Sequence, residues 1–315
     1  MRRRFDVALA GVLVVLAVVG ALRWVDTTAY PVVVLQTAGP FVVIGVALLA
    51  AANAALRRWR VLAATAGVLA VSLFLAVPPY FSSASPKATT ELTVMTANLQ
   101  EGRADAAQVM DAVRAHAVDV IVLVEVTPEA VESLRKEGLD EQFSASAGEA
   151  RADSIHGTLV YSRFPIEAAT GDVIDTAASL QPEVTLTVDG RRVNLKAVHA
   201  PAPLAGEVDR WREGLRSLAR WEDGRNGPVL LVGDFNADSG HPGFRALTRN
   251  LSDSHRAAGL GWVRTWPFAG HRMPPYVQLG HLLSRDLTVV TAGQVAVHGT
   301  DHAIIWASYA FTRGG

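Results

Sequence analysis

Three long apolar runs dominate the first 82 residues of this 315-residue chain and restrict what it can fold into. They cover residues 7–22, 31–56 and 61–77. A helix that crosses a bilayer needs roughly 20 apolar residues, with a range of about 17–25. The middle run is long enough by itself, and the outer two reach that length with their flanking residues. We therefore expect three transmembrane helices at the N-terminus.

Buried core helices are the alternative interpretation of these runs. That interpretation fits poorly, because the runs follow one another closely and hold almost no charge. A cleaved signal peptide after the initial MRRR would explain the first run, but it leaves the next two unexplained.

Charge is divided unevenly along the chain. Residues 1–82 carry seven Arg, no Lys and two acids, a net charge of +5, whereas the remainder has a net charge of −6 and all nine His. Arginines stand before the first run and between the second and third, at Arg2, Arg3, Arg4, Arg57, Arg58 and Arg60. Positive charge favours the cytoplasmic side. We thus expect a multi-pass protein of the cell membrane, with a cytoplasmic N-terminus and everything after the third span outside.

The rest of the chain divides by composition. The Pro-, Ser- and Thr-rich stretch PPYFSSASPKATT indicates a linker, so we expect an anchor over 1–82, a linker over 83–90 and one domain over 91–315. The chain has no cysteine, which excludes disulfides, thiolate catalysis and Cys-ligated zinc.

Strand and helix patterns alternate early in the domain, and antiparallel hairpins follow. We expect helices over 104–117 and 205–221, and another that is capped by Thr127 and begins at Pro128. The segment VDG predicts a hairpin turn. Strands are expected at 91–98, 118–126, 157–162, 183–188, 192–199, 229–235, 279–284, 287–293 and 303–309. This order predicts an α/β fold, a layered sandwich rather than a pure βαβ winding.

An acid, amide or histidine follows several of these apolar strands. The residues are Asn98, Glu125, His199, Asp234, Asn236, Asp301 and His302. Because the carboxyl ends of strands meet at one crevice in layered α/β folds, we expect these side chains to lie close together.

Each residue also has a purely structural interpretation. Glu125 suits an exposed position at a helix start, and Asp234 beside a glycine suits an Asx-turn. His199 suits a hydrogen-bonded core position, and Asp301 a turn. Their joint occurrence favours a functional site over four separate explanations.

The residue types fit phosphoester chemistry. Mg²⁺ prefers oxygen ligands, commonly one or two carboxylates together with water and substrate phosphate, and Glu125 with Asn98 supplies such ligands. An Asp can orient or deprotonate an attacking water, and a His can protonate or neutralise a phosphoryl oxygen. The sequence has no G-x-S-x-G motif of a serine hydrolase.

The motifs together resemble the endonuclease/exonuclease/phosphatase superfamily. VMTANLQEGRAD, VIVLVEVTPE, GTLVYSRFPI, VHAPAP, LLVGDFNAD and GTDH occur in the family's order over roughly residues 91–310. The resemblance implies two packed mixed β-sheets flanked by helices. With the apolar runs in front, the chain is similar to membrane-anchored bacterial members.

The resemblance also implies site roles. Asn98 and Glu125 match the metal positions, with Mg²⁺ or Mn²⁺ as the expected ion. His199 matches an active-site His of deoxyribonuclease-like members. Asp234 resembles the Asp that orients water, and Asn236 the amide that steadies the phosphoryl group.

The terminal motif carries the last pair of roles. Asp301 and His302 match the family's acid–His pair, in which the His contacts the phosphate. One position departs from the family pattern, because Gly280 stands where an Asp usually supports that His. Without this carboxylate, His302 is less well oriented and its charged form less favoured.

These features predict a divalent-metal-dependent phosphoesterase on the extracytoplasmic face of the membrane. It would hydrolyse a phosphodiester or a phosphomonoester by activated water, with nucleic acid or a phospholipid headgroup as the substrate. The net charge of −6 does not favour nucleic acid as a partner. The alternative is a catalytically impaired binding or sensor protein of the same fold, because of Gly280. The expected partners are the bilayer and a phosphoester substrate. The sequence assigns no role to three further residues, Trp211, Trp266 and His271, which are core or pocket residues.

Overall fold

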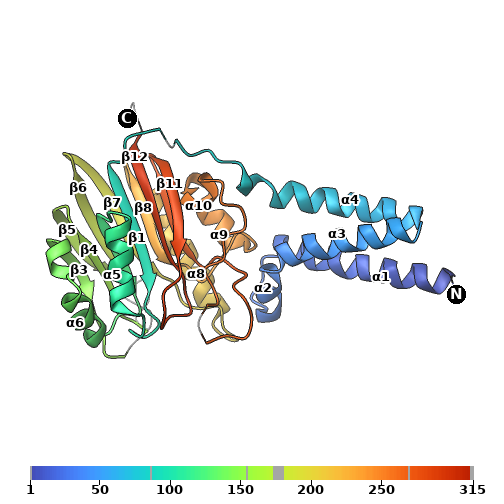
Figure 1. The fold of residues 1–315 in the computed structure, drawn as a ribbon, viewed down its shortest axis with the longest axis horizontal. Helices are drawn as coiled ribbons and strands as arrows, with labels where there is room; N and C mark the ends of the chain where they lie inside the picture. The colour runs from blue at the N-terminus through green and yellow to red at the C-terminus, as the bar shows by residue number, and fades with distance from the viewer. Residues whose placement is uncertain (1, 86, 154, 173–180, 269, 313–315) are drawn as a thin grey trace.

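In the computed structural model, a bundle of N-terminal helices projects from a layered α/β domain (Figure 1). The structure describes residues 2–85, 87–153, 155–172, 181–268 and 270–312, with the side chains of 2–4 and 168–172 left out. The apolar helices and the domain therefore form separate parts of the molecule that meet at one end of the bundle.

Three helices of the N-terminal part lie alongside one another and point away from the domain (Figure 1). The segments Phe5–Trp24 and Trp59–Ala76 are long and apolar enough to cross a membrane, and the bent helix pair Tyr30–Gln36 and Gly39–Ala55 adds a third crossing if it forms one span. The elements are α1 (Arg2–Ala21), η1 (Leu22–Trp24), α2 (Tyr30–Gln36), α3 (Gly39–Ala55), α4 (Trp59–Ala76) and η2 (Pro78–Tyr80).

The second apolar run is not the single straight helix that its length suggests. It breaks after Thr37, and the axes of α2 and α3 differ by 65°. Pro40 lies in the first turn of α3, where a missing N–H costs nothing, and its ring prevents a continuous helix through this point. Val33 and Gln36 on α2 are buried, so α2 lies against the α/β domain instead of continuing the bundle.

Two mixed six-stranded sheets form the centre of the domain, which confirms the predicted α/β sandwich. The first sheet has the order β11-β12-β1-β2-β4-β3 and the second β5-β6-β7-β8-β10-β9. In each sheet one pair is parallel, β1 with β2 and β7 with β8, and the other pairs are antiparallel.

The strands of the first sheet are β1 (Leu92–Asn98), β2 (Val120–Val124), β3 (Ala145–Glu149), β4 (Thr158–Ser162), β11 (Leu287–Val295) and β12 (Ile304–Phe311). Those of the second are β5 (Ile166–Asp172), β6 (Gln181–Val188), β7 (Arg191–His199), β8 (Val229–Asp234), β9 (Ser252–Asp253) and β10 (Gly280–Arg285).

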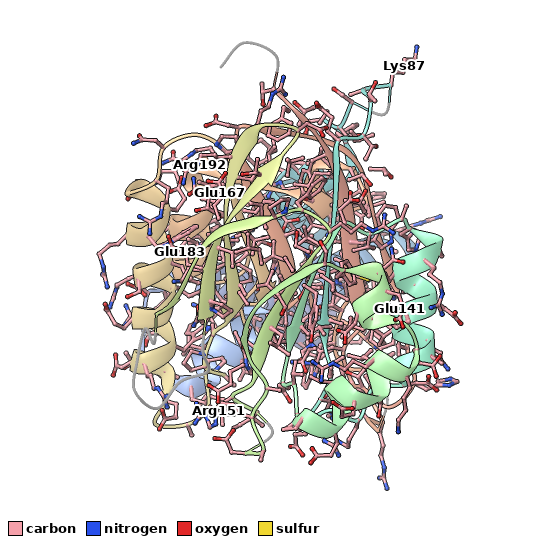
Figure 2. All side chains as sticks on the ribbon, turned by 90° about the vertical axis from the view of Figure 1, so that its left-hand side faces the viewer. Lys87, Glu141, Arg151, Glu167, Glu183 and Arg192 are labelled. Atoms are coloured by element: carbon pink, nitrogen blue, oxygen red, sulfur yellow. The ribbon has the colours of Figure 1, made fainter. Side chains whose placement is uncertain are left out.

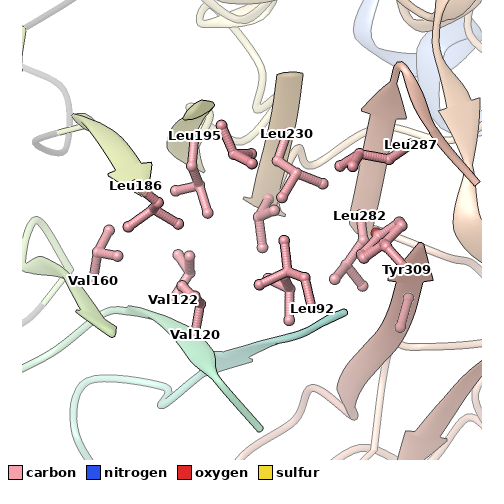
Figure 3. Packing of buried hydrophobic residues seen from close by; sticks show 14 of the residues in the cluster. Leu92, Val120, Val122, Val160, Leu186, Leu195, Leu230, Leu282, Leu287 and Tyr309 are labelled. Carbon is pink, nitrogen blue, oxygen red and sulfur yellow. The ribbon is translucent and has the colours of Figure 1, made fainter. Parts of the chain in front are cut away.

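Apolar side chains of the two sheets meet in a central core. Leu186, Leu195 and Leu230 from one sheet face Val122 and others from the opposite sheet (Figure 3). These side chains are withdrawn from solvent, and burying a Leu or Val contributes roughly 1.5–3 kcal/mol. The core therefore fixes how the two sheets lie against each other.

Helices cover both outer faces. On the first sheet lie α5 (Ala106–Ala115), α6 (Pro128–Lys136) and α7 (Leu139–Gln142), whose apolar side chains pack on Met95, Ile121 and Leu123. On the second lie α8 (Val208–Asp223) and α9 (Pro242–Leu247), packed on Leu231 and neighbouring side chains. The short α10 (Ser254–Ala257) follows β9. Exposed charged residues such as Glu141, Glu167 and Arg192 lie at the periphery (Figure 2).

Local sequence signals are confirmed at several element ends. The Thr127 side chain accepts a hydrogen bond from the Ala130 amide at 3.2 Å and caps α6. Asp189 and Gly190 both have positive φ in the hairpin between β6 and β7, as a two-residue turn requires. The strands β3, β5 and β9 were not predicted, because ASAGE and IEAATGD have few β-branched or aromatic residues and β9 has two residues.

The segment that follows the anchor runs along the domain. Ser83 and Ala84 donate main-chain hydrogen bonds to the Ala257 carbonyl at 2.7 and 2.9 Å, and Ser85 donates to Val289 at 2.8 Å. Ala84 also packs against the central core. These contacts tie the end of the helical bundle to α10 and β11.

Candidate active site

Four strands from the two sheets deliver polar side chains to one place. Asn98 ends β1 and Glu125 follows its parallel neighbour β2 in the first sheet. His199 and Asp234 end the parallel neighbours β7 and β8 in the second sheet, where they are paired in register. Because the sheets pack face to face, the carboxyl ends of both parallel pairs form a single cluster.

Asn98 bridges the two carboxylates of this cluster. Its Nδ2 donates to Glu125 Oε1 at 3.0 Å and to Asp234 Oδ2 at 3.1 Å. Its Oδ1 accepts a hydrogen bond from the Gln100 amide at 2.8 Å, which fixes this orientation of the side chain. The Glu101 amide donates to Glu125 Oε2 at 3.0 Å. The loop after β1 therefore holds both Asn98 and Glu125.

Asp234 is buried, and its two oxygens have different neighbours. Oδ1 accepts a hydrogen bond from the Asn236 amide at 2.9 Å and closes an Asx-turn. Oδ2 faces Asn98 and lies 3.7 Å from His302 Nε2. Asp234 thus forms an Asx-turn with Oδ1, while Oδ2 faces the other side chains of the cluster.

Two histidines flank the carboxylates. His199 Nε2 lies 3.7 Å from Glu125 Oε1, and His302 Nε2 lies 3.7 Å from Asp234 and 3.8 Å from Asp301 Oδ1. Burial lowers the pKa of His199, although Asp234 and Glu125 oppose this shift. The buried imidazole of His199 is therefore harder to protonate than a solvent-exposed histidine.

Asp301 is held by two residues on the loop before β10. The Trp266 indole donates to Asp301 Oδ2 at 3.0 Å, and His271 Nε2 lies 3.2 Å from the same oxygen. Trp266 and His271 are thus site residues to which the sequence analysis gave no role, whereas Trp211 on α8 packs in the core. Spacing along the chain gave no signal for them, because 30 or more residues separate them from Asp301.

Thr300 in the GTDH segment anchors the terminal motif to β1. Its hydroxyl donates to the Asn98 carbonyl at 2.8 Å and accepts from the His302 amide at 3.1 Å. Thr300 is fully buried. The threonine of this motif therefore has a structural role, since it positions His302 beside Asn98.

Asn236 lies in the cluster, but its side chain is already engaged. Its Nδ2 donates to the Ala200 carbonyl at 2.9 Å, which ties the loop after β8 to the loop after β7. In this arrangement the amide nitrogen holds the backbone in place and does not point freely toward a phosphoryl group.

Glycine is required just before Asp234. A Cβ on Gly233, whose φ is +146°, would lie 1.9 Å from the Val198 carbonyl oxygen on β7. Glu125 and Asn236 adopt left-handed φ values of 55° and 48°, which are uncommon for residues with a side chain. These strained positions turn the chain at the strand ends where the cluster forms.

Gly280 on β10 lies opposite Asp234 in the second sheet. A Cβ at this position would point toward Ile305 Cδ1, 3.3 Å away. Of the carboxylates that the structure describes, those nearest to His302 Nε2 are Asp234 and Asp301, both beyond hydrogen-bond distance. His302 is thus placed by main-chain contacts more than by a carboxylate partner.

The donor set fits a hard divalent cation with few protein ligands. Glu125 and Asp234 supply carboxylate oxygens, whereas Asn98 directs its nitrogen toward them. In the described part of the chain, no group of three or more His, Asp or Glu side chains is arranged as a metal cage. Mg²⁺ commonly takes one or two carboxylates and completes its shell with water and substrate phosphate, so the residues present fit it.

All seven residues expected at the strand ends lie in one connected cluster. Comparison with known proteins agrees with this picture, since the model of the endonuclease/exonuclease/phosphatase family matches residues 95–302. The chain belongs to this family, whose members hydrolyse phosphoester bonds. No curated protein sequence matches the chain.

Solved structures share the fold at low sequence identity. D. rerio TDP2 in complex with a single-strand DNA product is 14% identical with a TM-score of 0.59, and the match covers 70% of this chain and 98% of that one. An endonuclease/exonuclease/phosphatase from Bacteroides vulgatus is 15% identical with a TM-score of 0.56, over 71% of this chain and all of that one. Both matches support the same two-sheet architecture.

Proposed function

We propose that this protein is a divalent-metal-dependent phosphoesterase that resembles the membrane-anchored bacterial members of its family. Its α/β domain lies on the extracytoplasmic side of the membrane. The proposal rests on one observation, which is that polar side chains from both sheets form a single cluster at the carboxyl ends of β1, β2, β7 and β8 and beside β12. The residues of this cluster are Asn98, Glu125, His199, Asp234 and His302. Two carboxylates and two histidines at this spacing suit hydrolysis of a phosphoester by water.

Each residue has a role that follows from its contacts. Glu125 would hold the cation, and a bound Mg²⁺ or Mn²⁺ would neutralise charge on the phosphoryl oxygens. Asp234 Oδ2 accepts a proton from, or orients, the attacking water. His199 Nε2 lies near Glu125 and His302 Nε2 near Asp234, and each would donate a hydrogen bond to a phosphoryl oxygen. Trp266 and His271 keep Asp301 in place beside His302.

The substrate is a phosphodiester, either nucleic acid or a phospholipid headgroup. The net charge of −6 on the outer part favours the headgroup, because binding to a nucleic-acid backbone depends on basic side chains. Similarity to a protein that binds single-strand DNA keeps nucleic acid as a candidate. Binding of a DNA oligonucleotide over a range of salt separates them, since a flat salt response argues against recognition of the phosphate backbone.

Hydrolysis of bis(p-nitrophenyl) phosphate by the full chain in detergent tests the proposal. We expect turnover with Mg²⁺ or Mn²⁺, loss of turnover with EDTA, and a fall of about 10²-fold in kcat/KM for Glu125→Gln. Glu141→Gln, at an exposed position on α7, is the matched control and should retain the wild-type rate. The proposal would be contradicted if the protein hydrolysed no phosphoester with any divalent metal, or if Glu125→Gln and Glu141→Gln had equal rates.

A catalytically impaired binding or sensor protein is the second candidate. The observation that favours it is Gly280, because no carboxylate from β10 supports His302. In that case the domain would retain phosphoester binding but lose efficient turnover. The Gly280→Asp substitution distinguishes the two candidates, as described in the Discussion.

A further inference from the structure

A cavity of about 540 Å³ lies where the helical bundle meets the α/β domain. One wall is made by the bundle, with Val19 and Gly20 from α1, Val43 from α3, and Leu73 and Ala76 from α4. The opposite wall belongs to the domain and its flanking loops, including Phe244 and Tyr276. The cavity is thus apolar on the side of the candidate membrane spans.

Three arginines line the same cavity. Arg23 comes from η1, Arg245 from α9 and Arg256 from α10. Within the described residues, none of the three forms an ion pair with a carboxylate. Arg245 donates to the carbonyls of Ser239 and Gly240 and to that of Arg23, all of them neutral groups. The Nε of Arg23 is buried and has no hydrogen-bond partner in the structure.

The carboxylates nearby do not balance this charge. Asp253 lines the cavity but lies 2.6 Å from His281 Nδ1 as a buried pair. Asp238 also lines it and accepts a hydrogen bond from the Gly240 amide. Burial and the repulsion of Arg23 lower the pKa of Arg245, and the attraction of Asp238 opposes this only in part. The polar end of the cavity is therefore short of negative charge.

The location of the arginines relative to the spans suggests one kind of ligand. Arg23 follows the C-terminal end of α1, Ala76 ends α4, and Gly39 begins α3, so the polar end lies where these helices reach the domain (Figure 1). The apolar wall continues along the helices from that level. A ligand that matches both parts has an anionic head and an apolar tail.

We propose that this cavity binds an anionic phospholipid. Its phosphate lies among Arg23, Arg245 and Arg256, which donate charge-assisted hydrogen bonds to its oxygens, and an acyl chain lies along α1, α3 and α4. A zwitterionic headgroup fits less well because its cationic end would face the same arginines. The site is separate from the Asp234 cluster, and the proposal holds whether or not that cluster hydrolyses phosphoesters.

Native mass spectrometry of the full chain tests this site. The protein, stripped of lipid in a nonionic detergent, is mixed with equal amounts of phosphatidylglycerol and phosphatidylcholine that have identical acyl chains. We expect one phosphatidylglycerol per chain, preferred over phosphatidylcholine by about tenfold. The Arg23→Gln/Arg256→Gln variant should lose this preference. Arg245 is left unchanged, because it also donates to the main chain of η1.

The controls separate lipid binding from other causes. Arg249→Gln removes an exposed arginine that does not line the cavity and should bind lipid as the wild type does. Val43→Trp fills the apolar wall, keeps all three arginines, and should reduce retention of phosphatidylglycerol even if the double variant fails to fold. Equal retention of the two lipids, an unchanged preference in the double variant, or displacement of the lipid by inorganic phosphate would overturn the proposal.

Discussion

The Nδ2 of Asn98 donates a hydrogen bond to Asp234 Oδ2 at 3.1 Å, and this contact joins the carboxyl ends of β1 and β8, which belong to different sheets. The two residues are 136 positions apart in the chain. The same Asn98 nitrogen also reaches Glu125, so one amide sets the spacing of both carboxylates. The geometry of the candidate site therefore depends on how the two sheets pack.

Replacing the carboxylate of Asp234 should abolish most activity while leaving the fold intact. Asp234→Asn keeps the shape of the side chain but removes the proton acceptor, so we expect kcat to fall by roughly 10²–10⁴-fold. Steady-state hydrolysis of a generic phosphodiester measures this. Asp189→Asn in the exposed hairpin turn is the matched control, because asparagine tolerates the positive φ at that position. A rate within a few-fold of wild type in Asp234→Asn would remove Asp234 from the mechanism.

Introducing the family's carboxylate at Gly280 tests whether the site is impaired. A Cβ there comes within 3.3 Å of Ile305 Cδ1, so both Gly280→Asp and Gly280→Ala should lower the free energy of unfolding by about 1 kcal/mol. If the protein is an active phosphoesterase, wild type turns over and Gly280→Asp changes kcat/KM by less than about tenfold. An inert wild type that gains activity only in Gly280→Asp supports the sensor interpretation instead.

The contact between His241 and α2 should hold the bundle to the domain. The Asp238 amide donates to His241 Nδ1 at 2.9 Å, so the ring carries its proton on Nε2, which donates to the Val33 carbonyl at 3.1 Å. His241→Phe leaves both buried main-chain groups without partners, at a cost of about 1–3 kcal/mol. We expect faster deuterium uptake in peptides that cover α2, and no change in an exposed control, His298→Phe. Unchanged uptake in α2 would show that this contact does not hold the junction.

The buried pair Asp253–His281 should make stability depend on pH. Burial raises the pKa of Asp253, but the attraction and hydrogen bond of His281, together with His255 and the Arg256 amide, outweigh burial and lower this pKa from 3.8 to about 2. This contribution of about 2 kcal/mol is present above pH 3.8 and is lost as the pH falls through 2. Burial lowers the pKa of His281, but the attraction and hydrogen bond of Asp253, together with the Ala237 carbonyl and Asp238, outweigh burial and raise this pKa above 6.5. Its contribution is present below pH 6.5 and is lost as the pH rises through the raised value.

The two contributions overlap between about pH 4 and 6.5, where the pair stabilises most. Denaturant unfolding of the full chain in detergent at several pH values measures this. The difference in the free energy of unfolding between wild type and Asp253→Asn should be largest in that range and shrink on both sides. A difference that is constant with pH would mean that the pair does not titrate as described.

Much of the fold could be predicted because the relevant signals are local. The apolar runs, the cap at Thr127 and the VDG turn each depend on a few neighbouring residues, and the structure contains helices or turns at all of them. Edge strands such as β3 escaped prediction because pairing with β4, and not residue preference, makes ASAGE extended. The bend between α2 and α3 has a local cause, which is Pro40. It was not predicted because the residues on both sides of Pro40 are apolar and together suggest one continuous span.

The sequence by itself determined which residue types stand at the strand ends, since that follows from motif order along the chain. Only the tertiary structure decided that Asn98 directs its nitrogen to Glu125 and Asp234, that Trp266 and His271 support Asp301, and that Arg23 meets Arg245 and Arg256 at one cavity. These contacts join residues far apart in the chain, and they exist because two sheets and a helical bundle pack against one another.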